Sequence, residues 1–211
     1  MATYLFDFDG TLVDSMPTFV EAFTRILRRF DIPIPKDFVK TITPLGYGGA
    51  TKHLLSLGVP LSEEEAVEEI GKFCVGAYVN EIVAKPNVKE TLEALKARGD
   101  SLHVLTASPH LTLDPCLKRN GLYDLFENVW SCEDFATTKA DPAIYRMAAE
   151  RIGKPVGDII FLDDNLDADK TAKSAGMCVY AVFDESSREF ADEMRAVTDR
   201  YITDFSELLE E

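Results

Sequence analysis

Cysteine, basic residues and long apolar segments are all scarce in this sequence. Only four of its 211 residues are cysteine, and none stands in a C-x-x-C pair or at zinc-finger spacing from a histidine. Such a distribution is not typical of a disulfide framework and favours a reducing cytoplasm. No stretch approaches the ~18 to 20 apolar residues of a membrane helix, and no signal-peptide core precedes the apolar run at Tyr4. We therefore expect a soluble, cytoplasmic protein without a membrane partner.

Positive charge is also in short supply. Lysine and arginine number 22 and aspartate and glutamate 37, so the net charge is 22 − 37 = −15. So acidic a surface repels nucleic acid and anionic lipid, which argues against a polyanion-binding protein. The hydrophobic share of 46% and the charged share of 28% are ordinary for a globular protein. The length allows one full domain with a smaller insertion.

Short apolar runs alternate with helical patterns along most of the chain. Several of the helical patterns end at a glycine, the usual residue just after a helix. Strand and helix alternating in this way predict a doubly wound parallel sheet of the α/β class. The predicted strands are 3–8, 101–105, 128–131, 158–162 and 177–182.

One region interrupts this alternation with helical patterning and no convincing strand. Ser62 followed by Glu65 has the spacing of a capping box at a helix start. We predict an all-helical domain at 15–85, inserted into an α/β core domain made of 1–14 and 86–211.

Two pairs of carboxylates follow two of the predicted strands. Residues 7–15 read DFDGTLVDS, so Asp7 and Asp9 stand where the first strand ends, and Asp163 and Asp164 end the strand at 158–162. The carboxyl ends of parallel strands form the ligand-binding edge of a sheet. Like charges brought together there raise each other's pKa values unless a cation is present. Hard carboxylate ligands at this density favour Mg²⁺.

The string at 7–15 resembles the first motif of the haloacid dehalogenase-like hydrolase superfamily, in the phosphoglycolate phosphatase-like branch of subfamily I, which carries a helical cap. Three further motifs follow in order: an apolar strand ending at Thr106, then Lys139 ahead of a helix, then the strand ending in paired acids. The chain departs from the usual Lys-Pro-x-Pro of the third motif, because Ala140 replaces its first proline. The match spans nearly the whole chain.

This resemblance implies a phosphomonoester hydrolase that works through an aspartyl-phosphate. Asp7 would attack phosphorus, and Asp9 would protonate the leaving oxygen and then deprotonate water. The Thr106 hydroxyl and the Ala107 amide would bind phosphoryl oxygens. Lys139 would balance the charge of the nucleophile and of the transferring group.

The same resemblance implies a site for Mg²⁺. Its ligands would be the Asp7 side chain, the Asp9 carbonyl oxygen and Asp164, with Asp163 either a further ligand or an acceptor behind the metal. Two more acids stand nearby and are expected to be exposed on a first helical turn: Asp167 and Asp169.

Asp9 narrows the choice of activity within the superfamily. Dehalogenases lack an acid at this position, and phosphonoacetaldehyde hydrolases carry a small residue there. Hexose-phosphate mutases keep the acid but carry an arginine where this chain has Gly49, although Lys52 could supply a charge one turn away. The alternatives to a phosphatase are therefore such a mutase, or a non-catalytic binding or regulatory protein on the same fold.

The helical insertion contains a glycine-rich loop at 44–49, which reads PLGYGG. We expect this loop to face the active site and to shape the leaving-group pocket. Gly46 and Tyr47 are its candidate substrate contacts. Among the histidines, only His110 is placed to approach the site. The predicted partner is a small phosphorylated metabolite such as phosphoglycolate, a nucleotide or a sugar phosphate, and the sequence leaves open which one and whether the protein is a monomer or a homodimer.

Overall fold

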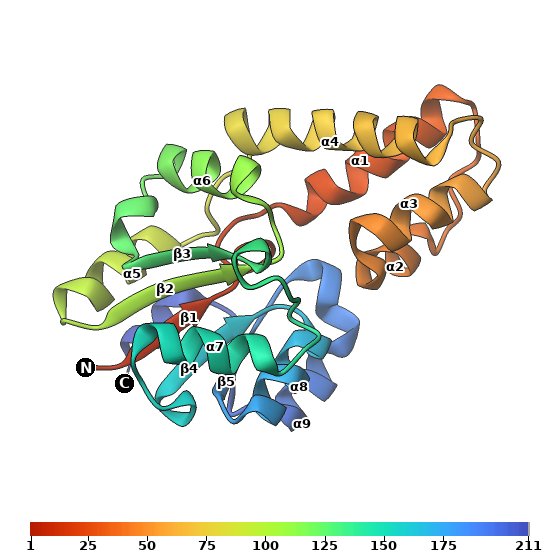
Figure 1. Ribbon diagram of the computed structural model, residues 1–211. Coiled ribbons are helices and arrows are strands. Elements are labelled where there is room, and N and C mark those ends of the chain that lie inside the picture. Colours follow the sequence, from red (N-terminus) through yellow and green to blue (C-terminus); the bar gives the residue numbers. More distant parts are fainter. Residues whose placement is uncertain (211) are drawn as a thin grey trace. The chain divides into compact units, whose positions relative to one another are not determined.

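The protein forms two compact units in the computed structural model, which describes residues 1–210 apart from the side chain of Pro44. One unit comprises Met1–Asp14 and Val83–Glu211, and the other is Ser15–Ile82 (Figure 1). The chain leaves the first unit after Asp14 and rejoins it at Val83, where an isolated bridge pairs Val13 with Ala84.

The first unit is built on a six-stranded parallel sheet in the order β3-β2-β1-β4-β5-β6. β1 is the point where the strand order reverses, with Phe6 opposite Val104 on one side and Leu162 on the other. The predicted α/β class is confirmed. The strands are β1 (Thr3–Phe6), β2 (Ser101–Thr106), β3 (Asn128–Ser131), β4 (Ile159–Asp163), β5 (Cys178–Val182) and β6 (Arg200–Ile202).

Helices cover both faces of this sheet. Figure 1 shows α5 and α6 on one face and α7, α8 and α9 on the other. Because both faces are covered, all four residues of β1 are buried, as in other parallel sheets. The helices are α5 (Val88–Ala97), α6 (His110–Arg119), α7 (Ala143–Ile152), α8 (Leu166–Ala175) and α9 (Ala191–Val197), with short 3₁₀ turns η2 (Tyr123–Leu125), η3 (Cys132–Phe135), η4 (Val156–Asp158), η5 (Glu185–Phe190) and η6 (Phe205–Leu209).

One buried aromatic pair on the α7 and α8 side also anchors a loop. The rings of Tyr145 and Phe161 meet edge to face with their centroids 5.0 Å apart, and both side chains are fully buried. The Tyr145 hydroxyl lies 3.2 Å from the carbonyl oxygens of both Lys139 and Ala168, which share its single donor hydrogen. This contact holds the loop before α7 against the start of α8.

The described residues of the second unit form helices and no strand. They are α1 (Met16–Arg29), α2 (Phe38–Ile42), the 3₁₀ turn η1 (Thr43–Leu45), α3 (Gly46–Ser56) and α4 (Glu63–Asn80). The predicted capping box is present at the start of α4. The Ser62 hydroxyl accepts from the Glu65 amide at 3.1 Å, and the Glu65 carboxylate accepts from the Ser62 amide at 2.8 Å.

No disulfide joins the four cysteines, whose side chains serve as small packing groups. Cys74, Cys116 and Cys132 are buried and Cys178 is half-buried. Burial raises the pKa of the Cys116 thiol to about 11, which makes it a poor nucleophile at neutral pH.

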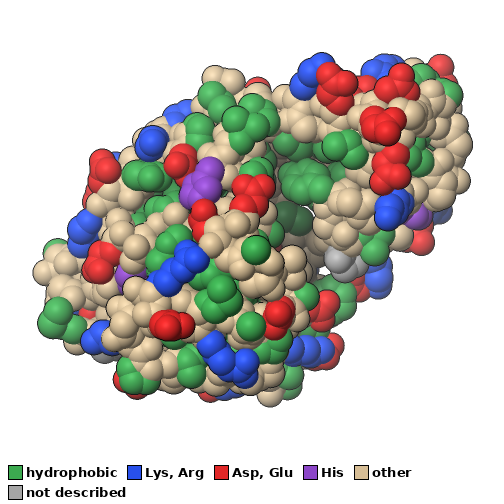
Figure 2. Space-filling model, viewed as in Figure 1, with side chains coloured by type: hydrophobic (Ala, Val, Ile, Leu, Met, Phe, Trp, Pro, Cys, Tyr) green, Lys and Arg blue, Asp and Glu red, His purple; other side chains and the backbone are tan. Residues whose placement is uncertain are grey.

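Surface charge follows the composition. On the face shown in Figure 2, basic side chains are scattered among acidic ones. Among residues 1–210, no helix has both the length and the apolar character needed to cross a membrane.

The capping box yields a stability prediction for the helical unit. We expect Ser62→Ala to lower its free energy of unfolding by about 1 kcal/mol, because the Glu65 amide at the start of α4 loses its side-chain acceptor. Urea denaturation followed by circular dichroism measures the change. Ser62→Thr keeps the acceptor and is the matched control, so an equal loss in both variants would contradict the role of the cap.

Candidate active site

A tight turn after β1 forms the centre of the candidate site. The Asp7 amide donates to the Leu162 carbonyl of β4 at 2.8 Å, and Gly10 then reverses the chain with φ +71°. A Cβ on Gly10 would lie 2.3 Å from a carboxylate oxygen of Asp164, so only glycine fits there. The Thr11 hydroxyl donates to the same carboxylate at 3.2 Å. The turn is therefore packed directly on the end of β4.

Three buried carboxylates converge at this sheet edge. Asp7, Asp163 and Asp164 each offer an oxygen, and these oxygens all lie within 4.8 Å of one another. The neighbouring parallel strands β1 and β4 place them there, as the sequence predicted. Because the donors are all oxygen and the carboxylates repel one another, the set suits a hard divalent cation such as Mg²⁺.

Lys139 lies against two of these carboxylates. Its ammonium donates to Asp7 and, at 2.7 Å, to Asp163, and its side chain is 14% exposed. Burial acts to lower the pKa of Lys139, but Asp163 and Asp7 together outweigh burial and hold it well above the usual value. The lysine is therefore a fixed positive charge in this cluster.

One ammonium does not balance the whole cluster. Burial raises the pKa of Asp7 to about 7, opposed by Lys139 and reinforced by Asp163 and Asp9. Burial, with Asp163 and Asp7, holds the pKa of Asp164 well above its ordinary value. In the absence of a further cation these carboxyl groups bind protons, and a bound cation would favour their ionised forms.

The end of β2 contributes hydroxyl groups to the same edge. Thr106 is buried at the last position of β2, and its hydroxyl oxygen accepts from the Ser108 amide at 3.1 Å. The Ser108 hydroxyl donates to the Asp9 carboxylate. Ala107, between them, is exposed. Ser108 is a site residue that the sequence analysis missed, although a second hydroxyl two positions after Thr106 was a visible signal.

Gly46 and Tyr47 belong to the other compact unit, so their predicted contact with substrate stays a prediction. Gly46 begins α3 with φ +59°, and Tyr47 packs on Phe19 with ring centroids 5.0 Å apart. Lys52 of α3 belongs to the same unit, so the charge that it could supply near the substrate also stays a prediction.

His110 is engaged by two carboxylates on neighbouring elements. Its ring nitrogens lie 2.7 Å from Asp114 on α6 and 2.9 Å from Asp134 on η3. Hydrogen bonds that the protonated ring donates to these two carboxylates raise the pKa of His110 above its usual value. This arrangement ties α6 to η3 and leaves both ring nitrogens already bonded.

The expectation that Asp169 is exposed was wrong. Asp167 is exposed as predicted, but Asp169 is fully buried, with no hydrogen-bond partner for either carboxylate oxygen among the described residues. Burial, followed by the charges of Asp163 and Asp164, raises its pKa to about 10. Asp169 shares the inner face of α8 with Ala172, three positions on. This helical spacing indicates burial, but the preference for acids in the first turn of a helix favoured an exposed position.

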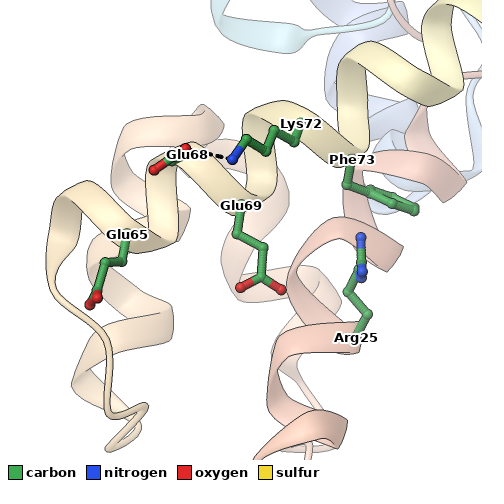
Figure 3. Close-up of a pocket in the computed structure, with 6 residues that line it drawn as sticks. All are labelled: Arg25, Glu65, Glu68, Glu69, Lys72 and Phe73. Carbon is green, nitrogen blue, oxygen red and sulfur yellow. Dashed lines mark hydrogen bonds and ion pairs between the residues drawn. The ribbon is translucent and has the colours of Figure 1, made fainter.

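The helical unit has a hollow of its own between α1 and α4, with a volume of about 470 Å³ (Figure 3). Its lining side chains pair with one another: Lys72 contacts Glu68 at 2.5 Å, and the Arg25 guanidinium lies 4.5 Å from the centre of the Phe73 ring. With Glu65 and Glu69 completing its wall, the hollow is acidic and unsuited to a phosphate.

Comparison of the sequence with known protein families identifies the family of this chain. A family model for haloacid dehalogenase-like hydrolases matches residues 1–176. The chain belongs to this family. It is 30% identical over 185 residues to a phosphoglycolate phosphatase from Pasteurella multocida, covering 82% of each chain.

Two solved structures superpose on almost the whole chain. One is named a predicted phosphoglycolate phosphatase from Haemophilus somnus, at 25% identity and a TM-score of 0.82, covering 100% of this chain and 97% of that one. The other, a putative beta-phosphoglucomutase from Thermotoga maritima, covers 100% and 99% with a TM-score of 0.80. At 22% identity, the second likeness shows the fold alone. Membership of the haloacid dehalogenase-like hydrolases confirms the resemblance found in the four motifs, and the relatives' names agree with a hydrolase of phosphoric monoesters.

The burial of Asp169 predicts a pH-dependent stability. The folded protein keeps this carboxyl neutral, whereas the unfolded chain releases its proton above about pH 4, so rising pH favours unfolding. We expect Asp169→Asn to stabilise the protein, with a gain that grows by up to about 1.4 kcal/mol per pH unit as the pH rises from about 4 toward about 10. Urea unfolding in the presence of a chelator measures it.

Asp167→Asn, on the exposed face of the same helix, is the matched control for this measurement. A stability gain for Asp169→Asn that stays constant over this pH range would show that the Asp169 carboxyl does not ionise on unfolding.

Proposed function

We propose that this protein is a Mg²⁺-dependent phosphatase that hydrolyses a small phosphorylated metabolite through an aspartyl-phosphate on Asp7. The observation that carries the proposal is the convergence of Asp7, Asp163 and Asp164 at one sheet edge, with the Lys139 ammonium paired to Asp7 and Asp163. The phosphatase names of the relatives supply the reaction class.

Asp7 is the proposed nucleophile. One of its carboxylate oxygens forms a bond to phosphorus while the bond from phosphorus to the leaving oxygen breaks. Asp9 donates its proton to that leaving oxygen. Asp9 then takes a proton from the water that attacks the phosphorus, which restores Asp7 and releases inorganic phosphate.

Fixed charges and dipoles would bind the transferring group. Lys139 offers a buried positive charge beside Asp7, and the Thr106 hydroxyl and the Ala107 amide are the proposed donors to phosphoryl oxygens. Mg²⁺, when bound, would neutralise charge on the phosphoryl group, and Asp7, Asp164 and the Asp9 carbonyl would hold it, with Asp163 as a further ligand or an acceptor behind it.

We assign the helical unit Ser15–Ile82 the role of a cap that excludes water from the site and selects the substrate. Gly46 and Tyr47 of this unit are the proposed contacts with the leaving group. Phosphoglycolate is the first candidate substrate because of the names of the relatives, followed by nucleotides and sugar phosphates.

A hexose-phosphate mutase is the second candidate, and Gly49 counts against it because mutases place an arginine there. A hexose 1-phosphate supplied as substrate separates the two activities, since a mutase yields the 6-phosphate isomer and a phosphatase yields inorganic phosphate. A non-catalytic binding protein on this fold is disfavoured because the chain keeps the nucleophile, the lysine and the metal acids.

Replacement of the nucleophile tests the mechanism. We expect Asp7→Asn to lower kcat by about 10³-fold or more while the protein stays folded, because an amide cannot form the acyl phosphate. Phosphate release from phosphoglycolate and from p-nitrophenyl phosphate measures the loss, and circular dichroism reports the fold. Asp167→Asn, an exposed acid, is the control, and near-normal turnover by Asp7→Asn would refute the assignment.

Metal removal tests the cation. We expect a chelator to abolish phosphate release and added Mg²⁺ to restore it, because the carboxylate cluster needs a divalent cation to ionise fully. Calorimetric titration of Mg²⁺ into wild type and Asp164→Asn provides a readout that is independent of turnover. Unchanged Mg²⁺ affinity in Asp164→Asn would rule this residue out as a ligand.

A further inference from the structure

Lys85 lies against the Gly10 turn of the candidate site and has no role in the reaction described above. It stands in the segment where the chain rejoins the α/β unit, and its own amide donates to the Leu12 carbonyl at 3.0 Å. Its ammonium donates to the Gly10 carbonyl and, at 2.9 Å, to the Phe183 carbonyl, and it forms an ion pair with Asp184 at 2.8 Å. An ammonium has three donors, and two of them are engaged by backbone carbonyls.

This ammonium is a sheltered group. The side chain of Lys85 is 15% exposed and that of Asp184 only 6%. A buried ion pair of this kind contributes little net stability, since desolvation offsets most of the attraction. The contact of the Lys85 ammonium with the site itself is the one that it makes with the Gly10 carbonyl.

Two sets of contacts fix the Gly10 turn, one with Asp164 and one with Lys85. On one side Gly10 approaches the Asp164 carboxylate so closely that no Cβ fits, and Thr11 donates to that carboxylate at 3.2 Å. On the other side the Lys85 ammonium holds the Gly10 carbonyl. Asp9 immediately precedes this turn, and its side chain is fixed at its far end by Ser108. The backbone of Asp9 thus depends on the Gly10 peptide for its position.

We propose that Lys85 is a positioning residue for the reaction, acting through the Gly10 carbonyl to hold Asp9 where it protonates the leaving group. This inference rests on the proposed phosphatase function. It extends that function by naming a residue outside the four motifs on which proton transfer depends.

A displaced proton donor leaves a specific kinetic signature. A p-nitrophenolate leaving group is a weak base and departs with little help from an acid. The alkoxide of an alkyl phosphate is strongly basic and needs a proton as the bond to phosphorus breaks. Loss of the Lys85 anchor therefore penalises an alkyl phosphate far more than an aryl phosphate, whereas partial unfolding lowers both rates by the same factor.

The test compares kcat/KM of wild type and Lys85→Met on phosphoglycolate and on p-nitrophenyl phosphate, at saturating Mg²⁺. We expect a loss of about 100-fold on the alkyl phosphate and of less than about 5-fold on the aryl phosphate. Equal losses on the two substrates, or no loss on either, would overturn the proposal. Wild type that hydrolyses neither substrate would overturn the proposed function, and this inference with it.

Three variants control the experiment. Lys89→Met removes an exposed lysine four positions on and should keep wild-type kinetics on both substrates. Asp184→Asn keeps the two carbonyl bonds of Lys85 and should keep the wild-type ratio between the substrates; a shift as large as that of Lys85→Met would assign the effect to the ion pair and overturn the role of Gly10.

The double variant Lys85→Met/Asp184→Asn guards against misfolding. Lys85→Met alone leaves Asp184 buried without its cation, a cost that can unfold the protein. The double variant removes that charge as well and still lacks the Gly10 anchor. We expect it to fold and to show the same selective loss on the alkyl phosphate, and a wild-type substrate ratio in this variant would overturn the proposal.

Discussion

The repulsion among Asp7, Asp163 and Asp164 is the constraint around which the α/β unit is organised. Three carboxylates with oxygens within 4.8 Å of one another, all shielded from water, oppose folding unless positive charge is brought to them. Lys139 supplies one such charge from a loop far along the chain. The parallel pairing of β1 with β4 places the acids together, and Tyr145 holds the carbonyl of Lys139 so that its ammonium reaches them.

The same cluster explains how an acidic protein can act on an anion. The net charge of −15 repels long polyanions, and part of it lies in this buried group rather than on the surface. Attraction for a phosphate must therefore be local, from Lys139 and the cation that the carboxylates suit. A small phosphorylated metabolite can come close to this local positive charge. A nucleic acid polymer would also meet the negative surface around the site, which repels it.

Two lysines divide the work in the proposed enzyme. Lys139 faces the carboxylates and the transferring group, while Lys85 lies behind the turn and contacts the backbone. One acts through its charge at the reacting centre, and the other through the geometry of the chain. Ser108, just after β2, has a comparable part, because its hydroxyl donates a hydrogen bond to the Asp9 carboxylate.

Local patterns were sufficient for most of the fold. The strand predicted at 128–131 coincides with β3, the other predicted strands differ from β1, β2, β4 and β5 by one or two residues at their ends, and Ser62 with Glu65 forms the capping box that its spacing predicted. β6 was missed because its three residues are too few to show a period. The burial of Asp169 was missed because an acid in the first turn of a helix was expected to be exposed, although its spacing from Ala172 indicates the inner face of α8.

The sequence by itself determined which reactive groups this protein has and in what order they occur. Short sequence motifs contain Asp7, Asp9 and the paired acids at the end of β4. Each motif covers the end of a strand and the turn after it, and adjacent residues are enough to specify these. Only the tertiary structure decided which atoms meet. Ser108 reaches Asp9 across 99 positions and Lys85 reaches Gly10 across 75. Such contacts depend on how strands pair and how the chain returns from its insertion, and no local pattern records them.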